Sequence, residues 1–169
     1  MRHFTLPERR HGISRLADAV TTAVYGPFAP HEYLRLRRVA AGYEPDRFAR
    51  DYATIAAHGR PNPVPPLSVT ESRIAFRRLR GELALLEQPG AIATSDATLR
   101  RIASLIPFDP AVYRQLASEP ADRHPRICRS CGCSGHDACS HDDSVCTWVT
   151  AALCSHCVER SAAAASVAA

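Results

Sequence analysis

Apolar positions between residues 29 and 117 recur every three or four residues, which is the spacing of amphipathic helices. Within 71–88, for example, Phe76, Leu79, Leu83 and Leu86 fall on one helical face. No segment before residue 127 alternates apolar and polar residues as a half-buried strand does. The pattern therefore predicts an all-α arrangement before residue 127, with helices at 13–25, 29–41, 45–57, 71–88, 95–105 and 110–117.

Residues that break or cap helices separate these segments. Gly42 suits the position just past the end of a helix, and Pro45 suits the first turn of the next. The stretch 58–68 contains four prolines, so it is expected to be a loop or a polyproline-like spacer. Thr70 is expected to cap the helix that follows.

Composition divides the chain into five expected parts. These are an N-terminal arm with a short helix at 1–28, a helical domain at 29–117, a polar linker at 118–127, a cysteine-rich module at 128–158 and a disordered, alanine-rich tail at 159–169.

Charge is unevenly divided between these parts. All 21 basic side chains are arginine, and the net charge is +4. The excess of positive charge lies before Cys128, whereas the cysteine-rich part and the tail together are acidic. Arginine favours planar, bidentate contacts to phosphate or guanine. A GC-rich genome also replaces lysine by arginine throughout, so the segregation of charge is more informative than the absence of lysine.

No stretch approaches the 18 or so uncharged apolar residues of a transmembrane helix, and the N-terminus lacks the apolar core of a signal peptide. A cytoplasmic protein without membrane contact is therefore expected. In that compartment, clustered cysteines more often hold a metal ion than form disulfides.

The seven cysteines include two Cys-x-x-Cys pairs, Cys128/Cys131 and Cys154/Cys157. Each such turn directs two sulfurs to one point, and two turns complete a tetrahedron. The separation of the pairs is close to that of tetra-thiolate zinc sites. The sequence therefore predicts a Zn²⁺ site at these four residues, and Trp148, Val149, Leu153 and Ile127 are expected to form a small apolar floor beneath it.

Three further cysteines, Cys133, Cys139 and Cys146, leave room for a second zinc ion. The fourth ligand of a Cys3His site would be His141, with His136 and His156 as alternatives. An interleaved pairing of ligands between two sites stays open. So does an iron–sulfur cluster, because seven thiolates exceed the need of one zinc ion.

The stretch 33–53 has the pattern of a helix-turn-helix, with Gly42 at the turn and the small residue Ala49 where the helices cross. It resembles the phage-repressor (XRE-type) helix-turn-helix family, and the resemblance covers residues 31–117. The residues that match the family's motifs are Tyr33, Leu36, Arg37, Gly42, Tyr43, Phe48, Ala49, Leu86, Glu87, Gly90, Leu99, Ile102, Ala103 and Leu105. The chain departs from the family by an insertion of about 12–17 residues around the proline-rich stretch, where the family has a short turn.

The resemblance implies that the 71–88 helix is the recognition helix. Arg73, Arg77 and Arg80 share one face of it and are the natural contacts to bases or phosphates, and Arg35 and Arg38 are expected to touch the DNA backbone. The alternative is a compact helical domain whose arginine face is merely solvated. The predicted fold class is therefore an all-α, helix-turn-helix-like domain followed by a small, irregular zinc-stabilised module.

The cysteine-rich segment is similar to a C-terminal module of phage-related bacterial proteins, through the run from Cys128 to Cys139, Cys146-Thr147-Trp148 and the closing 153–157. That resemblance implies metal binding and no particular reaction. Zinc-protease, zinc-deaminase and phosphate-loop motifs are missing from the sequence. His136, Asp137, Asp142 and Asp143 are interpreted as solvated loop residues or as hydrogen-bond partners of the metal ligands, so no enzyme activity is expected.

Three functions remain as hypotheses. The first is a DNA-binding transcription regulator whose zinc module mediates partner contact or homodimerisation. The second is an adaptor that docks on the transcription machinery, such as RNA polymerase, without binding DNA by itself. The third is an iron–sulfur or redox sensor.

Overall fold

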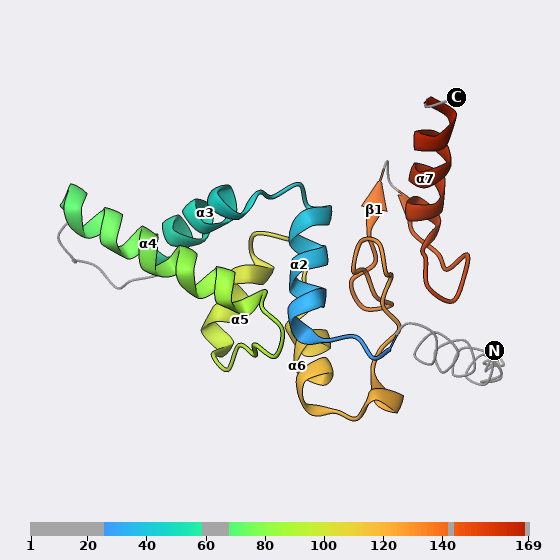
Figure 1. The fold of residues 1–169 in the computed structure, drawn as a ribbon, viewed down its shortest axis with the longest axis horizontal. Helices are drawn as coiled ribbons and strands as arrows, with labels where there is room; N and C mark the ends of the chain where they lie inside the picture. Colours follow the sequence, from blue (N-terminus) through green and yellow to red (C-terminus); the bar gives the residue numbers. More distant parts are fainter. Residues whose placement is uncertain (1–25, 59–67, 142–143, 168–169) are drawn as a thin grey trace, which may run out of the picture.

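The computed structural model describes residues 26–58, 68–141 and 144–167 (Figure 1). The helix expected at 13–25 and most of the N-terminal arm lie outside the described residues. The described helices are α2 (Pro30–Ala40), α3 (Pro45–His58), α4 (Val69–Leu86), α5 (Asp96–Ala103), α6 (Pro110–Ser118), the 3-10 turn η1 (Ala121–Arg123) and α7 (Ser155–Val167). None of them is both long and apolar enough to cross a membrane.

The five helices α2 to α6 confirm the helical periodicity of the sequence, with ends that differ from expectation by one or two residues. The first residue of α4 is the clearest correction, because Ser68 and not Thr70 caps it. The Ser68 hydroxyl accepts from the Glu71 amide at 3.3 Å, and the Glu71 carboxylate accepts from the Ser68 amide at 2.8 Å. This reciprocal capping box needs an acidic residue three positions after the cap; Thr70 has Arg73 there.

The core of the helical part is built around aromatic side chains. Tyr33 of α2 stacks on Phe108, with ring centroids 5.1 Å apart, and Phe108 in turn contacts Tyr113 of α6. Phe48 of α3 and Ile102 of α5 are also fully buried. Phe48, Ile102 and Tyr113 lie on apolar helical faces that the sequence periodicity indicated, whereas Phe108 lies in the connection between α5 and α6. Burial of these side chains holds the helices together.

Helix α4 packs along α3 through its apolar stripe. Leu83 is buried, and Phe76, Leu79 and Leu86 are half-buried against the same core. The N-terminal half of α4 extends away from the other helices, at the edge of the molecule (Figure 1). One side of this helix is consequently open to solvent.

The chain beyond α6 folds around the cysteines with little regular structure. Strands β1 (Ser140–His141) and β2 (Ser144–Val145) pair antiparallel, with Ser140 opposite Val145. They lie on the side of α2 opposite α3 and α4 (Figure 1).

The C-terminal tail corrects the expectation of disorder after residue 159. Helix α7 continues to Val167 through an alanine run. Alanine has the highest intrinsic helix propensity, so these residues extend a helix that begins at the second cysteine pair, although residues 161–166 are exposed.

Candidate metal centre

The first Cys-x-x-Cys pair lies on a tight turn that ends in Gly132. The Gly132 amide donates to the Cys128 carbonyl at 2.9 Å, and the Cys128 amide donates to the Cys133 carbonyl at 2.8 Å. Gly132 has a φ of +76°, which L-residues with a Cβ rarely adopt. The turn directs the Cys128 and Cys131 sulfurs to the same side.

The second pair lies where α7 begins. Cys154 is bridged to Trp148 by an isolated β-bridge, and the amides of Cys157 and Val158 both donate to the Cys154 carbonyl at 3.1 Å. The first helical turn therefore brings Cys157 to the same side of the chain as Cys154.

All four sulfurs of these pairs lie within 4.8 Å of one another, and all four residues are buried. The Sγ atoms of Cys131 and Cys154 are 3.8 Å apart. Metal–sulfur bonds of about 2.3 Å in a tetrahedron place sulfurs about 3.8 Å apart. The group predicted from the spacing is therefore assembled by the fold, and its dimensions suit a single metal ion.

The electrostatics of the cluster also suit a cation. The thiols of Cys131 and Cys133 donate to Cys128 and so lower the pKa of Cys128, whereas donating raises the pKa of Cys131 and of Cys133. Burial raises the pKa of Cys139 to about 12. Crowded thiols retain protons because neighbouring thiolates repel, and a bound metal ion replaces those protons.

Arg160 supplies positive charge beside the first group. Its guanidinium donates to the Cys157 Sγ and to the Ser130 hydroxyl, at 3.4 Å in both cases. A sulfur-rich site carries excess negative charge, so this contact stabilises its deprotonated form.

The three remaining cysteines gather at the same place. Cys131, Cys133, Cys139 and Cys154 form a second set whose sulfurs lie within 4.8 Å of one another. Cys146 Sγ is 3.7 Å from Cys133 Sγ. The two sets have Cys131 and Cys154 in common, which the spacing of the cysteines does not indicate.

Of the three histidines proposed as a fourth ligand, His156 lies at the cluster, with its Nδ1 3.5 Å from Cys139 Sγ. His136 is exposed and belongs to neither set among the described residues. The His141 side chain lies outside the described part of the structure.

The expected apolar floor is partly wrong. Trp148 and Leu153 pack against the cysteines, and the Arg126 guanidinium lies 4.2 Å from the centre of the Trp148 ring. Val149 is 55% exposed. Ile127 is buried in the helical core instead, so the cysteine-rich part joins the helical part through a packed residue.

The interpretation of Asp137 as a solvated loop residue is wrong, because its side chain is only 9% exposed and is paired. Its carboxylate pairs with the Arg37 guanidinium of α2 at 3.1 Å and accepts from the Tyr33 hydroxyl at 2.7 Å. It also accepts from the amide and the hydroxyl of Ser134. Asp109 completes the network, since its amide donates to the Tyr33 oxygen.

Gly132 brings the cysteine turn directly against α2. A Cβ at this position would lie 3.0 Å from the Leu36 Cβ and 3.0 Å from the Arg37 Cδ. The lack of a side chain at Gly132, together with the Asp137 ion pair, fixes the cysteine cluster on the helical domain.

The arginines predicted to contact DNA have different surroundings. Arg73, Arg77 and Arg80 are exposed on α4. Arg38 is 7% exposed, and its guanidinium binds both carboxylate oxygens of Glu87, at 2.5 and 2.8 Å. The prediction that Arg38 touches a DNA backbone is therefore wrong, because a buried guanidinium with these partners cannot reach a phosphate.

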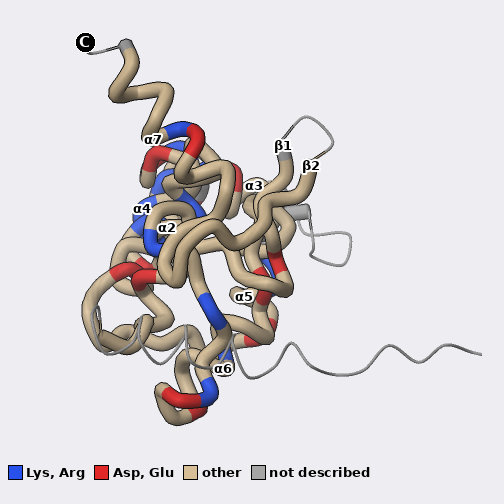
Figure 2. Tube along the Cα trace, turned by 90° about the vertical axis from the view of Figure 1, so that its right-hand side faces the viewer, with Lys and Arg blue, Asp and Glu red and all other residues tan. Residues whose placement is uncertain are grey.

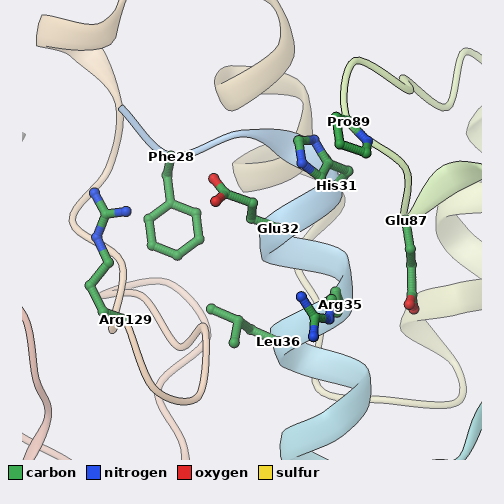
Figure 3. A pocket seen from close by; sticks show the side chains of 8 residues that line it. All are labelled: Phe28, His31, Glu32, Arg35, Leu36, Glu87, Pro89 and Arg129. Carbon is green, nitrogen blue, oxygen red and sulfur yellow. The ribbon is translucent and has the colours of Figure 1, made fainter. Parts of the chain in front are cut away.

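Arg35 is exposed and lines a shallow cavity of about 330 Å³ between the start of α2, the end of α4 and Arg129 (Figure 3). Glu32 and Glu87 also line this cavity, so its charge is mixed. No class of ligand is favoured by this lining.

A search for related proteins finds no matching family model, no match among the curated proteins and no match among the solved structures.

Proposed function

We propose that this protein is a DNA-binding transcription regulator with a structural zinc centre. The observation that supports DNA binding is the exposed arginine face of α4, formed by Arg73, Arg77 and Arg80. This face lies beside the apolar stripe through which α4 packs on α3. The packed stripe holds the helix in place, and the arginine face is directed to solvent. Basic positions are visible along α4 and α2 in Figure 2.

The arginines of this face are available for phosphate or guanine. Arg80 pairs with the exposed Asp46 at 2.7 Å, a contact that contributes little in water. Within the part of the chain that the structure describes, Arg73 and Arg77 form no ion pair. Ile74 is 62% exposed on the neighbouring face, and an apolar side chain there suits the methyl group of thymine.

The helix order agrees with this role. In the family resemblance stated for residues 31–117, α2 and α3 form the supporting helices, and α4 takes the place of the recognition helix. Arg35 stays a candidate for a backbone contact, and Arg38 is assigned to the buried pair with Glu87.

The metal is proposed to be Zn²⁺ in a structural role. Four thiolates at one ion fill its tetrahedral coordination, whereas a catalytic zinc keeps a position open for water. Sulfurs this close together suit one ion better than a cubane iron–sulfur cluster, in which each thiolate binds a separate iron.

The test of DNA binding is fluorescence anisotropy with a labelled duplex over a range of salt concentrations. Replacing Arg73, Arg77 and Arg80 together by alanine removes three possible phosphate contacts. We expect the slope of log affinity against log salt to become shallower by about 2.7, and affinity at ~0.1 M salt to fall on the order of 10²-fold.

The matched control replaces Arg100, Arg114 and Arg123, which are exposed on α5, α6 and η1, and changes the net charge by the same amount. This variant should retain most of the affinity. Equal losses in the two triple variants would contradict a specific role for α4.

Exposed apolar side chains on α4 favour the adaptor as a second candidate. Ile74 is 62% and Leu85 65% exposed, and a separation of 11 residues places them on one helical face. Absence of duplex binding by the unmodified protein at physiological salt would favour this alternative over DNA binding.

A further inference from the structure

The two sets of four cysteines at the metal centre overlap in two residues. Cys128 and Cys157 complete the first set, and Cys133 and Cys139 complete the second. Cys131 and Cys154 belong to both, and their sulfurs are 3.8 Å apart. Two tetrahedra that share this pair of sulfurs have a common edge.

We propose that the cluster holds two divalent metal ions of the zinc class that share the thiolates of Cys131 and Cys154. Cys128 and Cys157 are then the terminal ligands of one ion, and Cys133 and Cys139 those of the other. Each thiol that binds releases its proton to solvent, and the metal ions keep their oxidation state.

The number of sulfurs supports sharing. Two separate tetra-thiolate sites need eight thiolates, and the chain has seven cysteines. Two shared thiolates reduce the requirement to six. Two Zn²⁺ ions bound by six thiolates carry half the net negative charge of two Zn²⁺ ions bound by eight. The smaller charge favours sharing, because the sulfurs are largely buried and charge is costly to bury.

The rival arrangement is the separate Cys3His site made of Cys133, Cys139, Cys146 and His156. It has two contacts in its favour, Cys133 to Cys146 at 3.7 Å and Cys139 to His156 at 3.5 Å. Cys139 Sγ, however, is also 3.7 Å from Cys154 Sγ. The second set of four cysteines, which shares Cys131 and Cys154 with the first, has all its sulfurs within 4.8 Å of one another. The Ser144 hydroxyl lies 3.3 Å from the other ring nitrogen of His156, a contact that both arrangements allow.

Sharing has a spectroscopic consequence. Two ions bound to one sulfur lie at most about 4.6 Å apart, twice the metal–sulfur bond of about 2.3 Å. Scalar coupling between two ¹¹³Cd nuclei passes through a common ligand and is lost when the ligands are separate. The full-length protein loaded with ¹¹³Cd²⁺ is therefore expected to show two resonances that are coupled to each other.

Variants distinguish the two arrangements. His156→Ala should retain two ions and their coupling, because the shared arrangement has no histidine ligand. Cys131→Ser should abolish the coupling and release at least one ion, as measured by native mass spectrometry. Cys146→Ser is the matched cysteine control and should retain both ions.

Two resonances without coupling, loss of an ion from the His156→Ala variant, or one ion per chain would each overturn the proposal. The inference rests on metal binding by the cluster and is independent of DNA binding. The two proposals can therefore fail separately. A protein that does not bind DNA is still expected to show the coupled cadmium resonances, and a protein whose cadmium resonances are uncoupled is still expected to bind DNA.

Discussion

At the scale of single residues, Asp137 joins the cysteine cluster to the helices through side chains on both sides. Its carboxylate binds Arg37 and Tyr33 on α2 and Ser134 beside the cysteines. The Arg37 side chain is 2% exposed and that of Asp137 9%. A buried ion pair of this kind contributes little relative to an apolar replacement, but removing one partner leaves the other charge buried and unpaired.

Replacing Asp137 by alanine is therefore expected to lower the free energy of unfolding by about 3–5 kcal/mol. The measurement is chemical denaturation of the metal-loaded protein. Asp96→Ala is the matched control, because Asp96 forms exposed ion pairs with Arg100 and Arg114 and its loss should cost less than about 1 kcal/mol. Similar losses in the two variants would show that the Asp137 network has no special role.

At the scale of an element, α4 combines a good N-terminal cap with a weak interior. The Ser68 and Glu71 pair satisfies amides at its start, whereas the poor helix former Gly81 lies inside the helix, after its middle. A Cβ at Gly81 would meet nothing within 4 Å, and its backbone is helical. Glycine in such a position destabilises a helix because the unfolded chain gains more backbone freedom.

Gly81→Ala is expected to stabilise the protein by about 0.5–1 kcal/mol, with a higher thermal midpoint followed by circular dichroism. Gly42→Ala should have the opposite effect, since Gly42 has a φ of +71° at the turn after α2. A lower midpoint for Gly81→Ala would mean that the helix needs flexibility or close approach at this point.

The helices and the cysteine pairs could be predicted from the sequence because both depend on local spacing. Periods of three and four residues report which face of a helix is buried, and Cys-x-x-Cys reports a turn. The burial of Arg38 depends instead on Glu87, 49 positions away, and that of Asp137 on Arg37, 100 positions away. No local pattern distinguishes such residues from solvated ones.

At the scale of the whole molecule, the cysteine cluster and the helical domain share one interface. Gly132 lies directly against Leu36 and Arg37, and Ile127 enters the helical core. Helix α2 is therefore between the DNA-binding candidate α4 and the cysteines (Figure 1). The proposed metal ion would stabilise the folded cysteine turns, and the free energy of its binding is expected to stabilise the helices as well, through α2.

Removing the metal with a chelator at neutral pH is accordingly expected to lower the thermal midpoint of helix unfolding. The single tryptophan, Trp148, packs against the cysteines and reports on the metal centre by fluorescence, while circular dichroism reports on the helices. We expect both signals to shift together. A change in tryptophan fluorescence with an unchanged helical transition would show that the two parts are independent.

The buried pair of Arg37 and Asp137 has a consequence for synthesis on the ribosome. Arg37 is made 100 residues before Asp137, so all five helices of the core are complete while a central guanidinium still lacks its carboxylate. The helical domain reaches its native stability only after the cysteine turns have emerged and met α2. Ribosome-bound chains that end at residue 136, followed by a linker that places α6 outside the exit tunnel, should accordingly be cleaved by a protease within α2 to α6 more rapidly than otherwise identical chains that continue to residue 169.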